Sequence, residues 1–284
     1  MSGVDVIGTR LGLGCARLGS VLGCDRADAL ALVQTAYDRG IRFFDTANIY
    51  GQGESERMLG AALGSRRKQT TIVTKAGQYF PMWMRAARPL KGVIAPLIRR
   101  SGGGRQLLAK TRDAALPQDF SQGYLQVCID ASLRRLKSDY VDLLLLHSPP
   151  ADIIVRGEAV GHLEKIKAAG KAVSIGISCE DTESALLALN DPRIGAIELP
   201  LWPMTKEIEV ALDRARQRAI LVIGRGLMQA AAPNSDGDRW PAARATLSEA
   251  MARGDIGRVL VGTTRLTHLA RVLDAFQEQD ETCS

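Results

Sequence analysis

Three short apolar segments of this chain each run directly into a polar side chain that can take part in chemistry. These segments and the residues that close them are 41–44 with Asp45, 71–74 with Lys75, and 141–146 with His147. Continuous apolar runs are typical of strands in a parallel sheet, because such strands are buried on both faces. If the three strands lie parallel, their closing residues meet at one rim. This favours a β/α barrel, in which the active site lies at the carboxyl ends of the strands.

The rest of the chain continues the alternation of strand and helix. Further strands are expected at residues 11–15, 172–177, 194–199, 220–223 and 258–261. Apolar residues with helical spacing occur after Asp25, after Ser121 and from Leu266 onwards. We therefore predict a single α/β domain over residues 1–284, folded as one (β/α)8 TIM barrel.

An insertion at about residues 76–119 interrupts this alternation. Between Pro81 and Arg112 it carries eight basic residues and no acidic one, so the formal net charge of +6 is a local property. A nucleic-acid partner is therefore not expected. The insertion has two interpretations: a lid that attracts an anionic substrate or cofactor, or a solvated loop.

Cysteine and histidine usage argues against two other classes of protein. The five cysteines are scattered and never spaced as CxxC, which predicts reduced thiols in a cytoplasmic protein. Three histidines give no basis for a metal centre, so no metal is expected. No apolar run approaches the ~18 residues of a membrane helix. Residues 1–10 lack the pattern of a secretory signal, so we expect a cytoplasmic protein without a membrane partner.

Tyr50 follows Asp45 by five residues, in a stretch that should form a loop beside Gly51. A phenol titrates near ~10 in water and is a weak acid at neutral pH unless its anion is stabilised. The ammonium of Lys75 can stabilise that anion, Asp45 can hold the ammonium, and His147 can orient a carbonyl. These four residues, called the tetrad below, can transfer a proton to an oxygen, but a cofactor must supply the hydride.

The motifs around the tetrad resemble those of the aldo-keto reductases. They are FFDTA, IYG and ESERMLG within residues 43–60, IVTK at 72–75, and ASLRRLKSDYVDLLLLHSPP at 131–150. The resemblance extends over most of the chain outside the insertion. It implies a β/α barrel, a nicotinamide cofactor (NADP, as NADPH, rather than NAD), and reduction of aldehydes or ketones. By position, it implies that Tyr50 is the proton donor, that Asp45 and Lys75 tune it, and that His147 positions the carbonyl.

The resemblance also implies a set of cofactor contacts. In chain order these are Ser178, Cys179 and Glu198 at the nicotinamide amide, Trp202 at its ring, Arg225, Gly226 and Leu227 at the diphosphate, and Gly262, Thr263, Thr264 and Arg265 at the adenosine phosphate. The last four open a helix, where barrels often bind phosphate. This chain departs from the family pattern where Cys179 replaces an asparagine, Glu198 a glutamine, and Arg271-Val272 a Glu-Asn pair.

Several alternatives stay open at this point. Trp202 could be a packed rim aromatic, and residues 224–228 could form an ordinary surface turn. The tetrad could also oxidise an alcohol or sugar, or the chain could be a catalytically weak nucleotide-binding subunit or redox sensor on the same barrel. A further class would use Lys75 as a Schiff-base nucleophile. The expected partner is a small carbonyl or alcohol substrate, while the sequence specifies neither its identity nor the oligomeric state.

Overall fold

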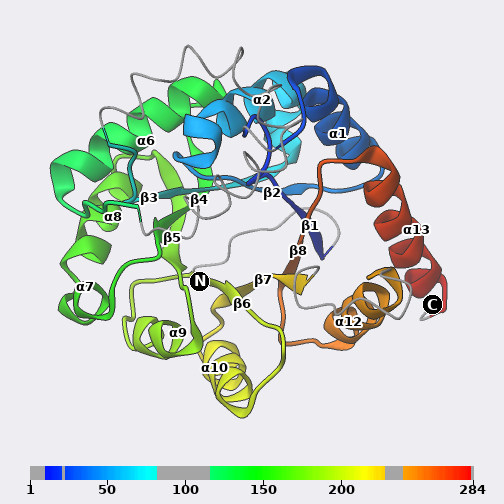
Figure 1. Ribbon diagram of the computed structural model, residues 1–284. Coiled ribbons are helices and arrows are strands. Elements are labelled where there is room, and N and C mark those ends of the chain that lie inside the picture. The colour runs from blue at the N-terminus through cyan, green and yellow to red at the C-terminus, as the bar shows by residue number, and fades with distance from the viewer. Residues whose placement is uncertain (1–9, 21–22, 82–115, 228–238, 283–284) are drawn as a thin grey trace, which may run out of the picture.

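Parallel strands close into one barrel, and helices surround it (Figure 1). The structure is a computed structural model that describes residues 10–20, 23–81, 116–227 and 239–282. In the order of both the chain and the barrel, the strands are β1 (Leu11–Gly14), β2 (Phe43–Asp45), β3 (Thr71–Ala76), β4 (Val141–His147), β5 (Ala172–Ser178), β6 (Ala196–Pro200), β7 (Leu221–Arg225) and β8 (Arg258–Gly262). β8 pairs with β1 and closes the sheet. The predicted (β/α)8 fold is confirmed.

Helices connect the strands and pack on the outside of the barrel (Figure 1). They are α1 (Arg26–Asp38), α2 (Glu54–Leu63), α6 (Gln122–Leu136), α7 (Ala151–Arg156), α8 (Glu158–Ala168), α9 (Thr182–Ala188), α10 (Lys206–Gln217), α12 (Trp240–Ala252) and α13 (Leu266–Thr282), with short 3-10 helices η1 (Tyr50–Gln52) and η2 (Gly64–Gln69). Asp25 caps α1 as its type and position suggest, accepting from the N–H of Asp28 at 2.9 Å. None of the helices that the structure describes combines the length and apolarity needed to cross a membrane.

The start of β2 differs from the sequence prediction. The apolar run begins at Ile41, but the strand begins at Phe43. Gly40 has a φ of 96°, and the N–H of Ile41 donates to the carbonyl of Ala36 at 2.9 Å. The backbone of Ile41 therefore still bonds to the last turn of α1 and does not join the strand, although the side chain of Ile41 is buried in the core.

Apolar side chains fill the barrel interior below the rim. They form one cluster of Phe43, Val73, Leu143, Leu145, Ala196, Ile223 and Leu260. Side chains on a strand alternate between its two faces, so Lys75 and His147, which lie two residues after members of this cluster, face the same interior. The ladder pairs Lys75 with Leu145 and His147 with Ser178. The apolar cluster thus supports the polar rim residues from below.

The two ends of the basic insertion lie side by side. Gln78 and Gln118 form an antiparallel bridge, and the N–H of Tyr79 donates to the carbonyl of Pro117 at 3.0 Å. Residues 82–115 are outside the described residues. The lid and the solvated loop therefore both stay predictions.

Gly176 in β5 tests how closely the barrel wall is packed. A Cβ atom there would lie 2.1 Å from the carbonyl oxygen of Ala196 and 2.9 Å from a methyl group of Leu145. We expect Gly176→Ala to lower the free energy of unfolding by roughly 1–3 kcal/mol, because β5 and β6 must move apart. Urea denaturation followed by circular dichroism measures this. The control is Gly123→Ala in α6, where an added Cβ meets nothing within 4 Å, and equal stability of the two variants would contradict the prediction.

Candidate active site

The four residues of the tetrad meet at the carboxyl rim of the barrel. Asp45 ends β2, Lys75 lies one residue before the end of β3, His147 ends β4, and Tyr50 begins η1. The ammonium of Lys75 donates to the carboxylate of Asp45 and lies 5.2 Å from the ring centroid of Tyr50. The rings of Tyr50 and His147 meet edge to face, with centroids 5.7 Å apart and planes at 87°. The structure therefore brings together four residues that the sequence analysis placed at three strand ends and in one loop.

The backbone fixes the position of Tyr50. The N–H of Asn48 donates to the carbonyl of Lys75 at 3.1 Å, so the segment leading to Tyr50 continues the pairing of β2 with β3. η1 then turns back at Gly51, which has a φ of 60°. A Cβ atom on Gly51 would lie 2.9 Å from the carbonyl oxygen of Gly19. Glycine at this position allows the tight turn that holds the phenol over the rim.

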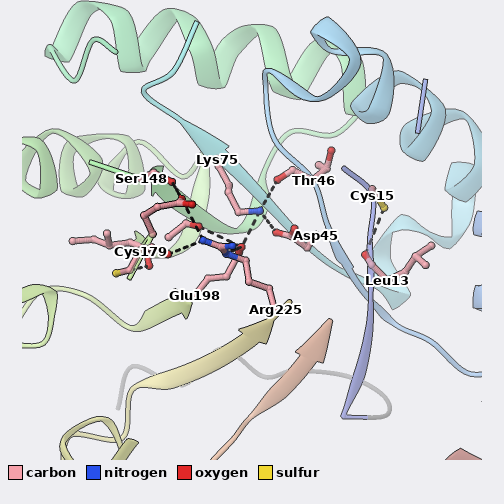
Figure 2. Close-up of polar contacts among 12 residues, drawn as sticks. Leu13, Cys15, Asp45, Thr46, Lys75, Ser148, Cys179, Glu198 and Arg225 are labelled. Carbon is pink, nitrogen blue, oxygen red and sulfur yellow. Dashed lines mark hydrogen bonds and ion pairs between the residues drawn. The ribbon is translucent and has the colours of Figure 1, made fainter. Parts of the chain in front are cut away.

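Lys75 is completely buried, and its ammonium contacts three oxygen atoms (Figure 2). Besides Asp45, these are the carbonyl oxygen of Thr46 at 3.2 Å and Oε2 of Glu198 at 3.2 Å. Glu198 lies in β6 and is only 1% exposed. The sequence analysis did not predict this second carboxylate on Lys75. The available signal was the alternation in β6, where Glu198 lies two residues after the inward-facing Ala196.

Burial and charge act in opposite directions on Lys75 and Tyr50. Burial lowers the pKa of Lys75, but Asp45, Glu198 and Tyr50 outweigh this, so its pKa is raised and the amine stays charged. Burial also has the largest effect on Tyr50 and raises its pKa to about 12, although the charge of Lys75 lowers it. The expected help from Lys75 is present, but desolvation reverses the net result. Tyr50 is therefore a neutral phenol at neutral pH.

His147 is a neutral imidazole in this setting. Burial lowers its pKa well below the usual value, and the charges of Lys75 and Arg225 lower that pKa further. Its Nδ1 atom is buried and has no hydrogen-bond partner among the described residues. A neutral imidazole carries one N–H donor and one acceptor. His147 can therefore donate a hydrogen bond to a carbonyl oxygen placed near the hydroxyl of Tyr50.

Side chains at the carboxyl ends of β5, β6 and β7 form a second polar group beside the tetrad (Figure 2). Ser178 Oγ lies 3.3 Å from Glu198 Oε1, and Arg225 Nε lies 3.6 Å from the same oxygen. Arg225 also donates to the carbonyl of Cys179 at 2.9 Å and to Glu180 at 3.3 Å. Ser178, Glu198 and Arg225, which the resemblance assigns to the cofactor, thus share the rim with the tetrad.

Cys179 and Leu227 do not present their side chains at the rim. The thiol of Cys179 is fully buried and donates to the carbonyl of Ile177 at 3.8 Å, while burial raises its pKa. Leu227 belongs to the apolar core. Ser178 faces the rim, and the alternation of side chains turns the next residue away from it, so the contact of Cys179 with the nicotinamide amide stays a prediction that the buried thiol does not favour. Trp202 is half-buried and packs against the core, and its Nε1 has no hydrogen-bond partner among the described residues.

The remaining implied contacts lie at the ends of β7 and β8. Gly226 follows β7 with a φ of 88°, and the exposed Gly262 ends β8. The hydroxyl of Thr263 accepts from the N–H of Arg265 at 3.2 Å, and Thr264 lies between them. Arg265 is exposed and immediately precedes α13. This turn offers backbone N–H groups and a cation at a helix start, which suits a phosphate.

Arg271 and Val272, the pair that departs from the family pattern, make contacts within the protein. The guanidinium of Arg271 lies 4.9 Å from the ring centroid of Trp240. Val272 is 1% exposed and packs in the core. Neither contact reproduces what a Glu-Asn pair would offer to an adenine ring.

The fold and the site together define a (β/α)8 barrel protein with acid–base groups at the carboxyl ends of its strands. Comparison with known proteins gives the family. Residues 10–212 match the sequence profile of the Aldo/keto reductase family, and the chain belongs to this family.

Two of the relatives are named as sugar dehydrogenases. D-threo-aldose 1-dehydrogenase of a Pseudomonas species is 31% identical over 245 residues, which cover 80% of this chain and 69% of that protein. L-galactose dehydrogenase of Arabidopsis thaliana is 34% identical over 175 residues, which cover 59% of this chain and 45% of that protein. For most of the curated relatives it matches, the chain spans about half of the relative's length.

Solved structures share the fold. A putative aldo-keto reductase from Pseudomonas aeruginosa superposes with a TM-score of 0.72 at 23% identity, covering 96% of this chain and 93% of that one. An aldo-keto reductase from Klebsiella pneumoniae in complex with NADPH superposes with a TM-score of 0.68 at 19% identity, covering 94% of this chain and 85% of that one. At these identities the likeness concerns the fold alone.

The neutral state of His147 predicts how stability depends on pH. A histidine in the unfolded chain titrates near ~6.5, whereas folded His147 resists protonation because its pKa is lowered. His147 should therefore lower the free energy of unfolding as the pH drops below ~6.5, by up to about 1.4 kcal/mol per pH unit, until folded His147 itself becomes protonated. Asp45, whose pKa is raised, contributes with the opposite sign, so the contribution of His147 is the difference between the wild type and a His147 variant. Urea denaturation at a series of pH values measures this slope.

His147→Gln should remove this contribution, so the free energy of unfolding of the variant should fall less than that of the wild type as the pH drops below ~6.5. The exposed His268 provides the matched control, since His268→Gln should keep the wild-type slope. An unchanged slope in His147→Gln would contradict the prediction.

Proposed function

We propose that this protein is an NAD(P)H-dependent oxidoreductase that reduces an aldehyde or ketone, with Tyr50 as the proton donor. The observation that carries this proposal is the phenol of Tyr50 held between a buried ammonium, that of Lys75, and a neutral imidazole, that of His147. Family membership supports carbonyl and alcohol redox chemistry in general. The acid–base assignment itself is our inference from the geometry.

The chain's own residues account for the proton transfer. Tyr50 is a phenol at neutral pH, because burial raises its pKa to about 12, so it begins the reaction with a proton to give. His147 donates a hydrogen bond to the carbonyl oxygen and holds it near the phenol. As the proton leaves Tyr50, the ammonium of Lys75 favours the developing phenolate, while Asp45 holds that ammonium in place. In the reverse direction the same phenolate would accept a proton from an alcohol.

A nicotinamide cofactor would supply the hydride. The residues present fit such a group. Glu198 Oε2 has no hydrogen-bond partner among the described residues, although the ammonium of Lys75 lies 3.2 Å from it, and this oxygen could accept a hydrogen bond from the carboxamide NH2. Ser178 Oγ lies beside that carboxylate. The turn that ends in Arg265 can hold the extra adenosine phosphate that NADP carries and NAD lacks, which favours NADP over NAD. The structure of a Klebsiella pneumoniae relative with NADPH shows a neighbour of the same fold with this cofactor.

The substrate proposed is a small carbonyl compound or the corresponding alcohol. Relatives named for aldose and L-galactose oxidation and for reduction of 6-dehydroglucose make sugars the first class to test. We infer that the protein works in the cytoplasm without a nucleic-acid or membrane partner.

A second candidate function is nucleotide binding with weak catalysis, as in a redox-sensing subunit. The observation that favours it is the double engagement of Lys75 by Asp45 and Glu198, which leaves less of its charge available to a phenolate. Tight binding of NADPH without turnover of any aldehyde, ketone, alcohol or sugar would support this second candidate.

Tyr50→Phe tests the proton donor. We expect this change to lower kcat for NADPH-dependent reduction of a carbonyl by about 10²–10⁴-fold, because the ring remains but its acidic proton is lost. NADPH oxidation measures the rate, and quenching of tryptophan fluorescence measures NADPH binding, which should change little. A Tyr79→Phe variant, changed in a half-exposed tyrosine outside the tetrad, is the control. Equal turnover by Tyr50→Phe and the wild type would refute the assignment.

Arg265→Ala tests the proposed phosphate site. A charged hydrogen bond of this kind contributes about 1.5–3 kcal/mol, so the Kd for NADPH should rise roughly 10- to 100-fold. The Kd for NADH, which lacks the extra phosphate, should change much less. Arg193→Ala, at the opposite end of β6 and bound to Asp191, is the control. A similar loss for both cofactors would show that Arg265 does not contact that phosphate.

A further inference from the structure

Glu198 is a buried carboxylate inside the tetrad's own contact network. Its Oε2 lies 3.2 Å from the ammonium of Lys75, and its Oε1 lies 3.3 Å from Ser178 Oγ and 3.6 Å from Arg225 Nε. Only 1% of the residue is exposed. Burying a carboxylate is costly unless it is paired. These contacts therefore hold Glu198 beside the ammonium of Lys75 (Figure 2).

Charged and titratable groups face Tyr50 from several strands of the barrel. They are Asp45 on β2, Lys75 on β3, His147 on β4, Glu198 on β6 and Arg225 on β7. Two of them are carboxylates that share a single ammonium. A shared ammonium stabilises a nearby phenolate less than an ammonium with one partner, because each carboxylate adds a repulsive charge.

We propose that Glu198 is a positioning residue that acts through Lys75: by sharing the ammonium with Asp45, it keeps Tyr50 in the neutral phenol form and so biases the site towards carbonyl reduction. This inference rests on the proposed function, because it concerns the same proton. In reduction, the O–H bond of Tyr50 breaks and the proton goes to the carbonyl oxygen, while the carbonyl carbon receives the hydride of the reduced nicotinamide. In oxidation, Tyr50 must start as phenolate to accept the alcohol proton. A residue that disfavours phenolate thus supports the first direction over a wider pH range.

The electrostatics agree with this geometry. After burial, which has the largest effect and raises the pKa of Tyr50, Lys75 lowers that pKa, whereas Asp45 and Glu198 raise it and Arg225 lowers it. Burial, the charge of Glu198 and a hydrogen bond with Glu198 also raise the pKa of Asp45, whereas Lys75 lowers it, so the two carboxyl groups interact with each other as well as with the ammonium. Removing the charge of Glu198 should therefore favour the phenolate of Tyr50.

The test compares Glu198→Gln, Glu198→Asp and Arg225→Gln in the full chain without cofactor. The phenolate absorbance of Tyr50 is followed in a stopped-flow pH jump, read before any unfolding, with each variant's own Tyr50→Phe form subtracted. We expect the pKa of Tyr50 to fall by roughly one unit in Glu198→Gln. Glu198→Asp should stay close to the wild type, because it keeps the charge. Arg225→Gln should move the pKa in the opposite direction, upwards.

These opposite signs separate a charge effect from simple loosening of the site. Loosening would admit water and lower the pKa of Tyr50 in both neutral variants. Where carbonyl reduction and alcohol oxidation are measurable, the limbs of their pH profiles should shift with the same sign and size as the phenolate titration. A Tyr50 pKa that is unchanged in Glu198→Gln, or that falls in both Glu198→Gln and Arg225→Gln, would overturn the inference. If Tyr50→Phe retains full turnover, the proposed function fails instead, while the titration still reports on Glu198.

Discussion

The fully buried ammonium of Lys75 is the group around which the rim of this barrel is arranged. An isolated charge in a protein interior costs several kcal/mol, so it persists only with oxygen atoms close to it. Asp45, Thr46 and Glu198 provide these atoms. Since β2 and β6 stand on opposite sides of the closed strand order, the ammonium links two walls of the barrel that share no backbone hydrogen bonds.

The apolar interior below the rim sets the chemistry of the groups above it. Side chains such as Phe43, Leu143 and Leu145 fill the barrel below the polar cluster. Desolvation has the largest effect on both groups: it raises the pKa of Tyr50 to about 12 and lowers the pKa of His147 well below its usual value. A neutral phenol and a neutral imidazole are the forms that a proton donor and a carbonyl-orienting group need. The barrel therefore does more than hold these residues in place, because burial in it shifts the pKa values of Tyr50 and His147.

The two halves of the rim differ in how closely they follow the family. On the strands β2 to β4 the acid–base residues occupy the positions that the motifs indicate. On the strands β5 to β8, Glu198 contacts Lys75 across the barrel, and Arg225 contacts both Glu198 and the backbone carbonyl of Cys179. The relatives share the fold and the family, but these contacts arise from this chain's own residues.

The sequence by itself determined the barrel and the tetrad, because both rest on local signals: apolar runs of strand length, and motifs that fix a residue's place relative to a strand end. It could not show that Ile41 precedes the strand, that the Cys179 thiol is buried in the core, or that Glu198 contacts Lys75. The first two depend on local backbone geometry at the ends of strands, and the third joins residues more than a hundred positions apart across the barrel. The sequence also indicated that Lys75 favours the phenolate of Tyr50, but it could not indicate the burial that raises the pKa of Tyr50. Only the closed tertiary structure decided how strongly burial outweighs charge at this site.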